Sequence, residues 1–205
     1  VIKTEETCNH LIFEDIVING QANTGSGILV DLAHDVGNVT FKNPDLENAY
    51  FGMRFGENVV ADVYSPYFER LGTGFVFTPA TSVDEVYSVN IYGGTVIVPS
   101  ASSRAIRFEG TFSRDEKIVI DGLEFQTDNH ATKTAMFSES AFIWQNEHPL
   151  ILSNLDFSWI TDPPQSVINA ARFSPIHPFN NTGGMRQQKF LFQIDDLADA
   201  TATDI

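Results

Sequence analysis

Two acidic side chains, Glu124 and Asp156, lie at matching places in two similar segments of the sequence. Residues 118–125 read IVIDGLEF and residues 150–157 read LILSNLDF, so each carboxylate lies two positions after a turn residue and between two apolar residues. Such alternation points the apolar side chains inward and the carboxylates outward. Asp121, just before the first turn, is expected to point outward as well.

These three carboxylates are the predicted catalytic residues. If Glu124 and Asp156 are stacked in neighbouring copies of one repeat, they suit a retaining glycosidase, whose two carboxyl groups lie about 5–5.5 Å apart. Asp45 occupies the same column three copies earlier. No cofactor is expected, although such carboxylates could hold Ca²⁺. The alternative is that a chain with 27 acidic residues simply exposes them on its outward face.

Three arginines, Arg54, Arg107 and Arg172, share one place in another recurring segment, in which a small residue is followed by apolar, variable and apolar positions. A spaced row of guanidinium groups could bind an acidic polysaccharide through bidentate hydrogen bonds to its carboxylates. The alternative is that these arginines pair with acidic neighbours and keep the surface soluble. They are predicted to bind substrate, without being directly adjacent.

Aromatic residues are the other predicted sugar-binding groups, because pyranose rings stack on aromatic faces. Tyr92 and Trp144 are the main candidates, and Tyr64 and Tyr67 also fall at outward or loop positions. Trp144 could equally cover a corner of the fold or contact another subunit.

Several classes of function are not expected. A formal charge of −15 and a pI near 4.5 disfavour binding to nucleic acid. No apolar run reaches the length of a membrane span. The five histidines lack metal-ligand spacing, so no metal site is expected, and the single cysteine cannot form an internal disulfide. Asn38-Val39-Thr40 and Asn180-Asn181-Thr182 are N-glycosylation sequons, although triplets this short recur by chance.

The segment around Glu124 recurs along the chain, which indicates the architecture that positions these residues. Copies are predicted to start at seven places with irregular spacing, and the copy at Val59 is predicted to carry a two-residue insertion. The turn column holds residues that tolerate a left-handed backbone. The predicted starts are Leu11, Val39, Val59, Val89, Ile118, Leu150 and Phe190, and the turn column is Asp15, Asn43, Gly93, Gly122 and Asn154.

The second segment type, which carries the arginines, falls between these copies. Six instances are predicted in register: 27–30, 52–55, 74–77, 105–108, 134–137 and 170–173. Two clear strands per repeat, with room for a short third and without helical periodicity, predict an all-β fold, a right-handed single-stranded parallel β-helix of about six to seven irregular coils. Residues 11–197 form this domain, residues 1–10 an upstream coil or cap, and residues 198–205 an acidic tail.

The turn-bounded strand pattern of residues 118–125 and 150–157 resembles the pectate-lyase-like β-helix superfamily. The irregular coil lengths are most similar to viral tailspike and adhesin domains. The resemblance covers roughly residues 10–195 and is one of pattern, since no catalytic motif of a member matches.

This resemblance implies a virion spike or adhesin domain that recognises cell-surface polysaccharide, on a virion surface or outside the cell. A homotrimer or larger assembly is expected, because an open coil end needs a cover. One alternative is a polysaccharide lyase or glycoside hydrolase on the same fold. Another is a purely structural stalk or capsid decoration, since fold alone does not determine function.

Overall fold

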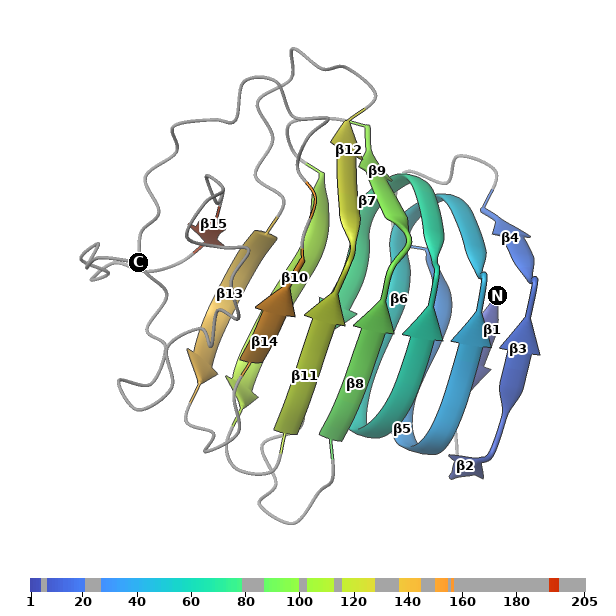
Figure 1. The fold of residues 1–205 in the computed structure, drawn as a ribbon. Helices are drawn as coiled ribbons and strands as arrows, with labels where there is room; N and C mark the ends of the chain where they lie inside the picture. Colours follow the sequence, from blue (N-terminus) through green and yellow to red (C-terminus); the bar gives the residue numbers. More distant parts are fainter. Residues whose placement is uncertain are drawn as a thin grey trace.

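The computed structural model describes residues 1–4, 7–20, 27–78, 87–99, 103–112, 116–127, 137–144, 150–154, 156 and 192–195. These residues form strands and turns and contain no helix, which confirms the expected all-β class (Figure 1). The strands are β1 (Ile2–Thr4), β2 (Cys8–Asn9), β3 (Ile12–Glu14), β4 (Val17–Asn19), β5 (Ile28–Lys42), β6 (Asp45–Tyr64), β7 (Tyr67–Phe77), β8 (Tyr87–Tyr92), β9 (Thr95–Val98), β10 (Arg104–Phe112), β11 (Glu116–Asp121), β12 (Glu124–Thr127), β13 (Phe137–Trp144), β14 (Leu150–Ser153) and β15 (Phe192–Asp195).

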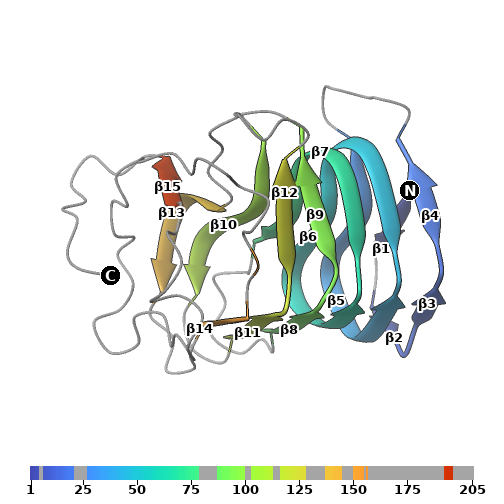
Figure 2. The same ribbon diagram turned by 45° about the horizontal axis from the view of Figure 1, so that its top comes forward.

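The strands pair in parallel and form three ladders. The first ladder runs from β3 through the ends of β5 and β6 to β8, β11 and β14. The second runs from β4 through the starts of β6 and β7 to β9 and β12. The third runs from β1 through β5, β6, β7 and β10 to β13 and β15. Figure 2 shows the long strands β5, β6 and β7 bending from one ladder into the next.

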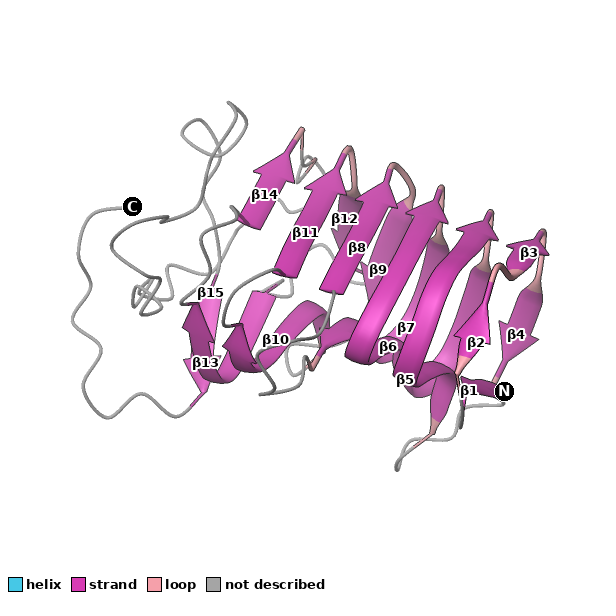
Figure 3. Ribbon diagram, turned by 90° about the horizontal axis from the view of Figure 1, so that it is seen from below, coloured by secondary structure: helices cyan, strands magenta, loops and turns pink. Residues whose placement is uncertain are grey.

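We call one passage of the chain through the third, first and second ladders a repeat. Successive repeats stack side by side, with the strands of each ladder aligned in a row (Figure 3). Parallel pairing between consecutive repeats, rather than hairpins, fits a parallel β-solenoid. The described part of the chain contains no helix of the length and apolar character needed to cross a membrane.

The core lies between the ladders and consists of stacked apolar columns. Alternate residues of each strand point inward, so one repeat places its side chains directly on those of the next. The fully buried columns include Phe41, Val63, Ile91 and Ile120 in the first ladder, Leu46, Phe68, Val96 and Phe125 in the second, and Phe55, Phe77 and Phe108 in the third.

The predicted turn column is confirmed by the backbone between the first and second ladders. Asp15, Asn43, Gly93, Gly122 and Asn154 all have positive φ, between 50° and 75°. In this conformation, the amide of one turn can donate to the carbonyl of the next repeat, as the amide of Gly93 does to Asp121 at 2.7 Å. Asn and Gly adopt this conformation at low cost, which explains their recurrence at the same corner.

The predicted insertion after Val59 is wrong. Ala61, not Val59, pairs with both Val39 and Val89, so this copy starts at Ala61 and has the same length from strand to turn as its neighbours. Its turn residue is Ser65, with φ of 48°. A serine in the left-handed region is uncommon, so the sequence does not identify this turn.

Two of the predicted copies in the third ladder are shifted by two residues. Val30, not Ile28, pairs with Met53, and Phe137 pairs with Ile106. A shift of two preserves which side chains face inward, so alternation alone cannot fix the register. In the copies whose predicted register is correct, the small first residue has a steric reason. A Cβ on Gly52 would lie only 2.6 Å from the carbonyl oxygen of Gly74 in the next repeat.

The seventh predicted copy of the segment around Glu124, the one expected to start at Phe190, is assigned to the wrong ladder. Phe192–Asp195 forms β15, which pairs with β13 in the third ladder instead of extending the first ladder beyond β14. Apolar alternation at 190–192 therefore indicated a strand but not its ladder, because strands of both types share that pattern.

Candidate functional site

Glu124 and Asp156 are paired across neighbouring repeats, in agreement with the predicted stacking. They form a parallel bridge in the second ladder, where the amide of Phe125 donates to the carbonyl of Asp156 at 2.8 Å. Because residues paired in register share a face, both carboxylates lie on the outward side, opposite the buried Phe125. We call the column formed by Val17, Asp45, Tyr67, Thr95, Glu124 and Asp156 the carboxylate column.

Hydrogen bonds fix the orientation of Glu124 within this column. Its Oε2 accepts from the hydroxyl of Thr95 at 3.0 Å, and its Oε1 accepts from the amide of Gln126 at 2.9 Å. Both donors are uncharged and belong to the same face of the sheet. Glu124 is thus a positioned carboxylate in register with the exposed Asp156, and the predicted catalytic role of the two stays a prediction.

Asp121 does not belong to this column. It ends β11 in the first ladder, and the turn at Gly122 separates it from Glu124. Its Oδ1 accepts a hydrogen bond of 2.8 Å from the amide of Asn154 in the next repeat. The structure therefore gives Asp121 a contact that joins two repeats, while its predicted catalytic role stays a prediction.

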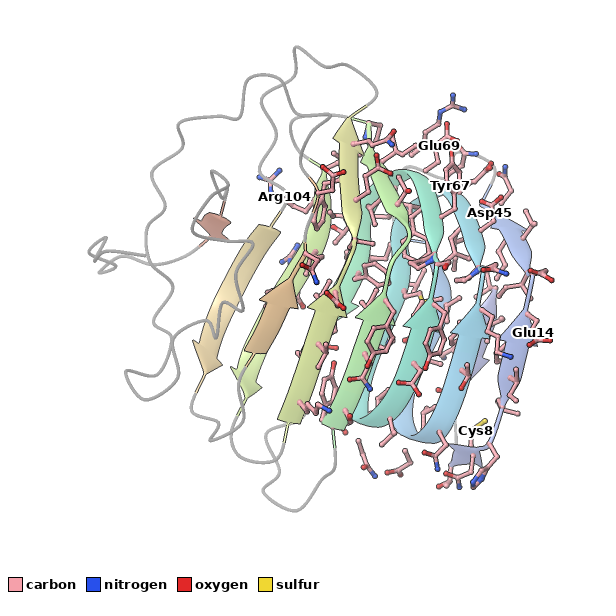
Figure 4. The ribbon with its side chains drawn as sticks, viewed as in Figure 1. Cys8, Glu14, Asp45, Tyr67, Glu69 and Arg104 are labelled. Atoms are coloured by element: carbon pink, nitrogen blue, oxygen red, sulfur yellow. The ribbon has the colours of Figure 1, made fainter. Side chains whose placement is uncertain are left out.

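A cluster at the other end of the carboxylate column was not recognised from the sequence. Tyr67 lies one repeat from Asp45, and its hydroxyl donates to Oε2 of Glu69 at 3.1 Å (Figure 4). Glu69 also forms an ion pair with Arg70. The signal that could have revealed the cluster is the shared pattern of Pro44-Asp45-Leu46-Glu47 and Pro66-Tyr67-Phe68-Glu69.

Burial raises the pKa values of two groups in this cluster, Asp45 and Tyr67. Desolvation, followed by the charge of Glu69, raises the pKa of Asp45 above its ordinary value. Burial and the hydrogen bond to Glu69 likewise raise the pKa of Tyr67. Within the described residues, Oδ1 of Asp45 has no hydrogen-bond partner, so its charge is poorly compensated at neutral pH.

Replacing Asp45 by asparagine should therefore stabilise the fold at neutral pH. A carboxyl whose native pKa is raised favours folding below its unfolded pKa of about 3.9, and this contribution is lost as the pH rises through the native value. The thermal midpoint of Asp45→Asn should exceed that of the wild type at pH 7, and the difference should vanish near pH 3. A variant less stable than the wild type at pH 7 would contradict this account.

Tyr64 and Tyr92 form a stacked pair on the neighbouring face, just before the turn column. Their rings lie 5.3 Å apart at an interplanar angle of 19°, and Tyr64 is 39% exposed. They belong to a column in which Lys42, one repeat earlier, is paired with Glu14. Since the two rings face each other along the ladder, the pair offers its hydroxyls and outer edges to a ligand, not the shared faces.

Of the three arginines predicted to bind substrate, the two that the structure describes already have carboxylate partners. Arg54 makes a bidentate pair with Asp31, both bonds measuring 2.8 Å, and Arg107 pairs with Glu109. The register places Asp31 directly beside Arg54, where the shifted alignment had placed Leu29. These contacts match the non-functional alternative for Arg54 and Arg107, while Arg172 lies outside the described residues.

Trp144 and the question of metal binding complete the predicted site. The backbone of Trp144 pairs with that of Phe112 at the end of β13, and its role in binding stays a prediction. Among the side chains that the structure describes, no three from His, Cys, Asp and Glu gather as metal ligands would.

Comparisons with models of protein families, with curated proteins and with solved structures find no match to this chain.

Proposed function

We propose that the chain is a right-handed single-stranded parallel β-helix of about six to seven coils, of the pectate-lyase-like type, that binds polysaccharide along its turn column. The three parallel ladders and the column of left-handed turn residues support this fold. The function proposed is that of a spike or adhesin domain on a virion surface or outside the cell.

The observation that carries this function is the position of three tyrosines on both sides of the turn column, of which Tyr64 and Tyr67 are exposed and Tyr92 is half-buried. Tyr64 and Tyr92 precede the turn, and Tyr67, 40% exposed, follows it. Strands in a ladder are spaced by about 4.8 Å, so such side chains repeat along a straight edge that a linear polymer can follow. Tyrosine combines an apolar ring with a hydroxyl, which suits the mixed surface of a sugar.

Polar side chains beside the tyrosines supply both hydrogen-bond donors and hydrogen-bond acceptors. In the first ladder the amide of Asn90 donates to Asp62 at 2.8 Å, and in the second ladder Glu124 lies along the same edge. The cations Lys42 and Arg70, which flank this edge, both pair with carboxylates. This charge pattern supports a neutral polysaccharide in preference to the acidic one that the arginine row had suggested.

Binding to a panel of neutral and acidic polysaccharides, measured by pull-down and calorimetry, tests this proposal. Replacing Tyr64 and Tyr92 together by alanine should weaken binding at least tenfold, equivalent to about 1.4 kcal/mol. Tyr50→Ala is the matched control, because Tyr50 is also 39% exposed but lies away from the turn column. Equal loss in both variants, or no binding to any polysaccharide, would overturn the proposal and favour a structural role.

A glycoside hydrolase or lyase is the second candidate, favoured by the pairing of Glu124 with Asp156. New reducing ends without an unsaturated product would indicate hydrolysis, and an unsaturated product a lyase. Glu124→Gln and Asp156→Asn should then abolish cleavage, whereas Asp121→Asn, in the other ladder, should not. Cleavage that survives in Glu124→Gln would exclude this site.

The proposed trimer is supported by apolar residues on the first repeat. Ile12 and Val17 are 65% and 68% exposed there, on the outward faces of β3 and β4, in register with Thr40 and Asp45. Covering such residues is a common reason for association. A monomeric mass in sedimentation at micromolar concentration would count against it.

A further inference from the structure

The asparagines with a left-handed backbone follow one pattern of hydrogen bonding. In four of the five described, the side-chain Nδ2 donates to an oxygen of the preceding repeat. These bonds are Asn43 to Asp15 at 2.9 Å, Asn48 to Asn19 at 3.3 Å, Asn58 to Asp35 at 2.6 Å and Asn154 to Asp121 at 2.8 Å. Each of these amide nitrogens is therefore turned along the ladder towards another strand.

Asn38 is the exception among the described asparagines of this kind. Its φ is 55°, its side chain is exposed, and it makes no side-chain hydrogen bond within the described structure. It lies where the register of β5 against β6 shifts between Val36 and Val39, so β5 has one residue more than its partner there. The extra residue of such a bulge leaves the ladder, which frees the amide of Asn38 from a neighbouring strand.

Asn38 also begins the triplet Asn38-Val39-Thr40, the sequence that oligosaccharyl transfer requires. Val39 is fully buried in the core, and Thr40 points to the outward side. We propose that Asn38 is an N-glycosylation site when the chain is made in a secretory pathway. In this step Nδ2 of Asn38 forms a bond to the anomeric carbon of a lipid-diphosphate-linked oligosaccharide, the bond from that carbon to the diphosphate breaks, and the amide loses one proton.

The position of Asn38 allows a glycan without loss of contacts. It lies at the start of a first-ladder strand, near the corner formed by β2, which Cys8 marks in Figure 4. The turn column with its tyrosines follows the other end of the same strand, beyond Lys42. A sugar on Asn38 therefore projects from a different corner, and this inference goes beyond the proposed polysaccharide binding and does not depend on it.

The test is secretion of the full chain from a eukaryotic cell behind a cleavable signal, followed by peptide mass mapping with and without a peptide N-glycosidase. The Asn38 peptide should carry a glycan in most molecules, and Thr40→Ala should remove it while Thr40→Ser keeps it. Enzymatic removal of the glycan should leave the thermal midpoint unchanged within about 2 °C, as expected for an exposed group without contacts. A secreted, folded chain with an unmodified Asn38 would overturn the proposal.

A matched variant tests the structural reason. Val60→Thr creates a third sequon, beginning at Asn58, whose Nδ2 is held against Asp35. Modification there would place the sugar against the neighbouring repeat, so this variant should be secreted less than the wild type or be left unmodified at Asn58. Efficient glycosylation of Asn58 with unchanged stability would show that the free amide of Asn38 has no bearing on modification.

Discussion

Replacing Phe77 by alanine should lower the free energy of unfolding by about 3–5 kcal/mol, the range for a large aromatic residue in a core. Phe77 is fully buried in the third ladder and stacks between two other phenylalanines. Its ring centroid lies 5.2 Å from that of Phe55 and 5.2 Å from that of Phe108. The alanine variant loses both stacks and leaves a cavity that the rigid ladders on either side cannot close.

Urea denaturation followed by hydrogen exchange measures this effect and locates it. In a solenoid each repeat contacts only its neighbours, so loss of protection should be greatest in β7, β6 and β10, with β3 and β4 little changed. Phe77→Leu is the control, since it keeps most of the buried volume and should cost less than half as much. Uniform loss of protection over all strands, or equal destabilisation by both variants, would contradict the stacked-column account.

The turn column shows why part of the fold could be predicted from sequence. A left-handed turn restricts the residue type at one position per repeat, and Asp15, Asn43 and Asn154 satisfy that restriction. The pairing of Glu124 with Asp156 could be predicted from these turns as well, because each of the two residues lies two positions after a turn residue. At Ser65 the residue type does not indicate a left-handed turn, so the predicted start of that copy is displaced by two residues.

The arginine row shows why the site was harder to predict than the fold. Strand alternation has a period of two, so it indicates that Arg54 points outward but not which residue of the preceding repeat lies beside it. The pairing of Val30 with Met53 places Asp31 there, and Arg54 forms an ion pair with it, while its predicted role in substrate binding stays a prediction. The contact between Tyr67 and Glu69 was missed for a related reason, because it depends on side-chain direction along a single strand.

Replacing Arg54 by leucine should therefore destabilise the protein and leave polysaccharide binding intact in the molecules that remain folded. Asp31 is 5% exposed, and without the guanidinium its carboxylate is a buried charge lacking its bidentate partner. Removing one member of a fully buried pair costs about 3–5 kcal/mol, but the Arg54 side chain is 36% exposed, so about 2–3 kcal/mol is expected.

The double variant Asp31→Leu, Arg54→Leu separates the ion pair from a binding role. Apolar replacement of both partners should restore most of the stability lost in Arg54→Leu, because no buried charge is left. If Arg54 instead binds a polysaccharide carboxylate, the double variant stays unable to bind acidic polymers even though it is stable. Denaturation and pull-down on the same samples distinguish the two. An ion pair predicts that the double variant recovers stability and that binding per folded molecule equals that of the wild type in both variants, whereas a ligand predicts that stability recovers and binding does not.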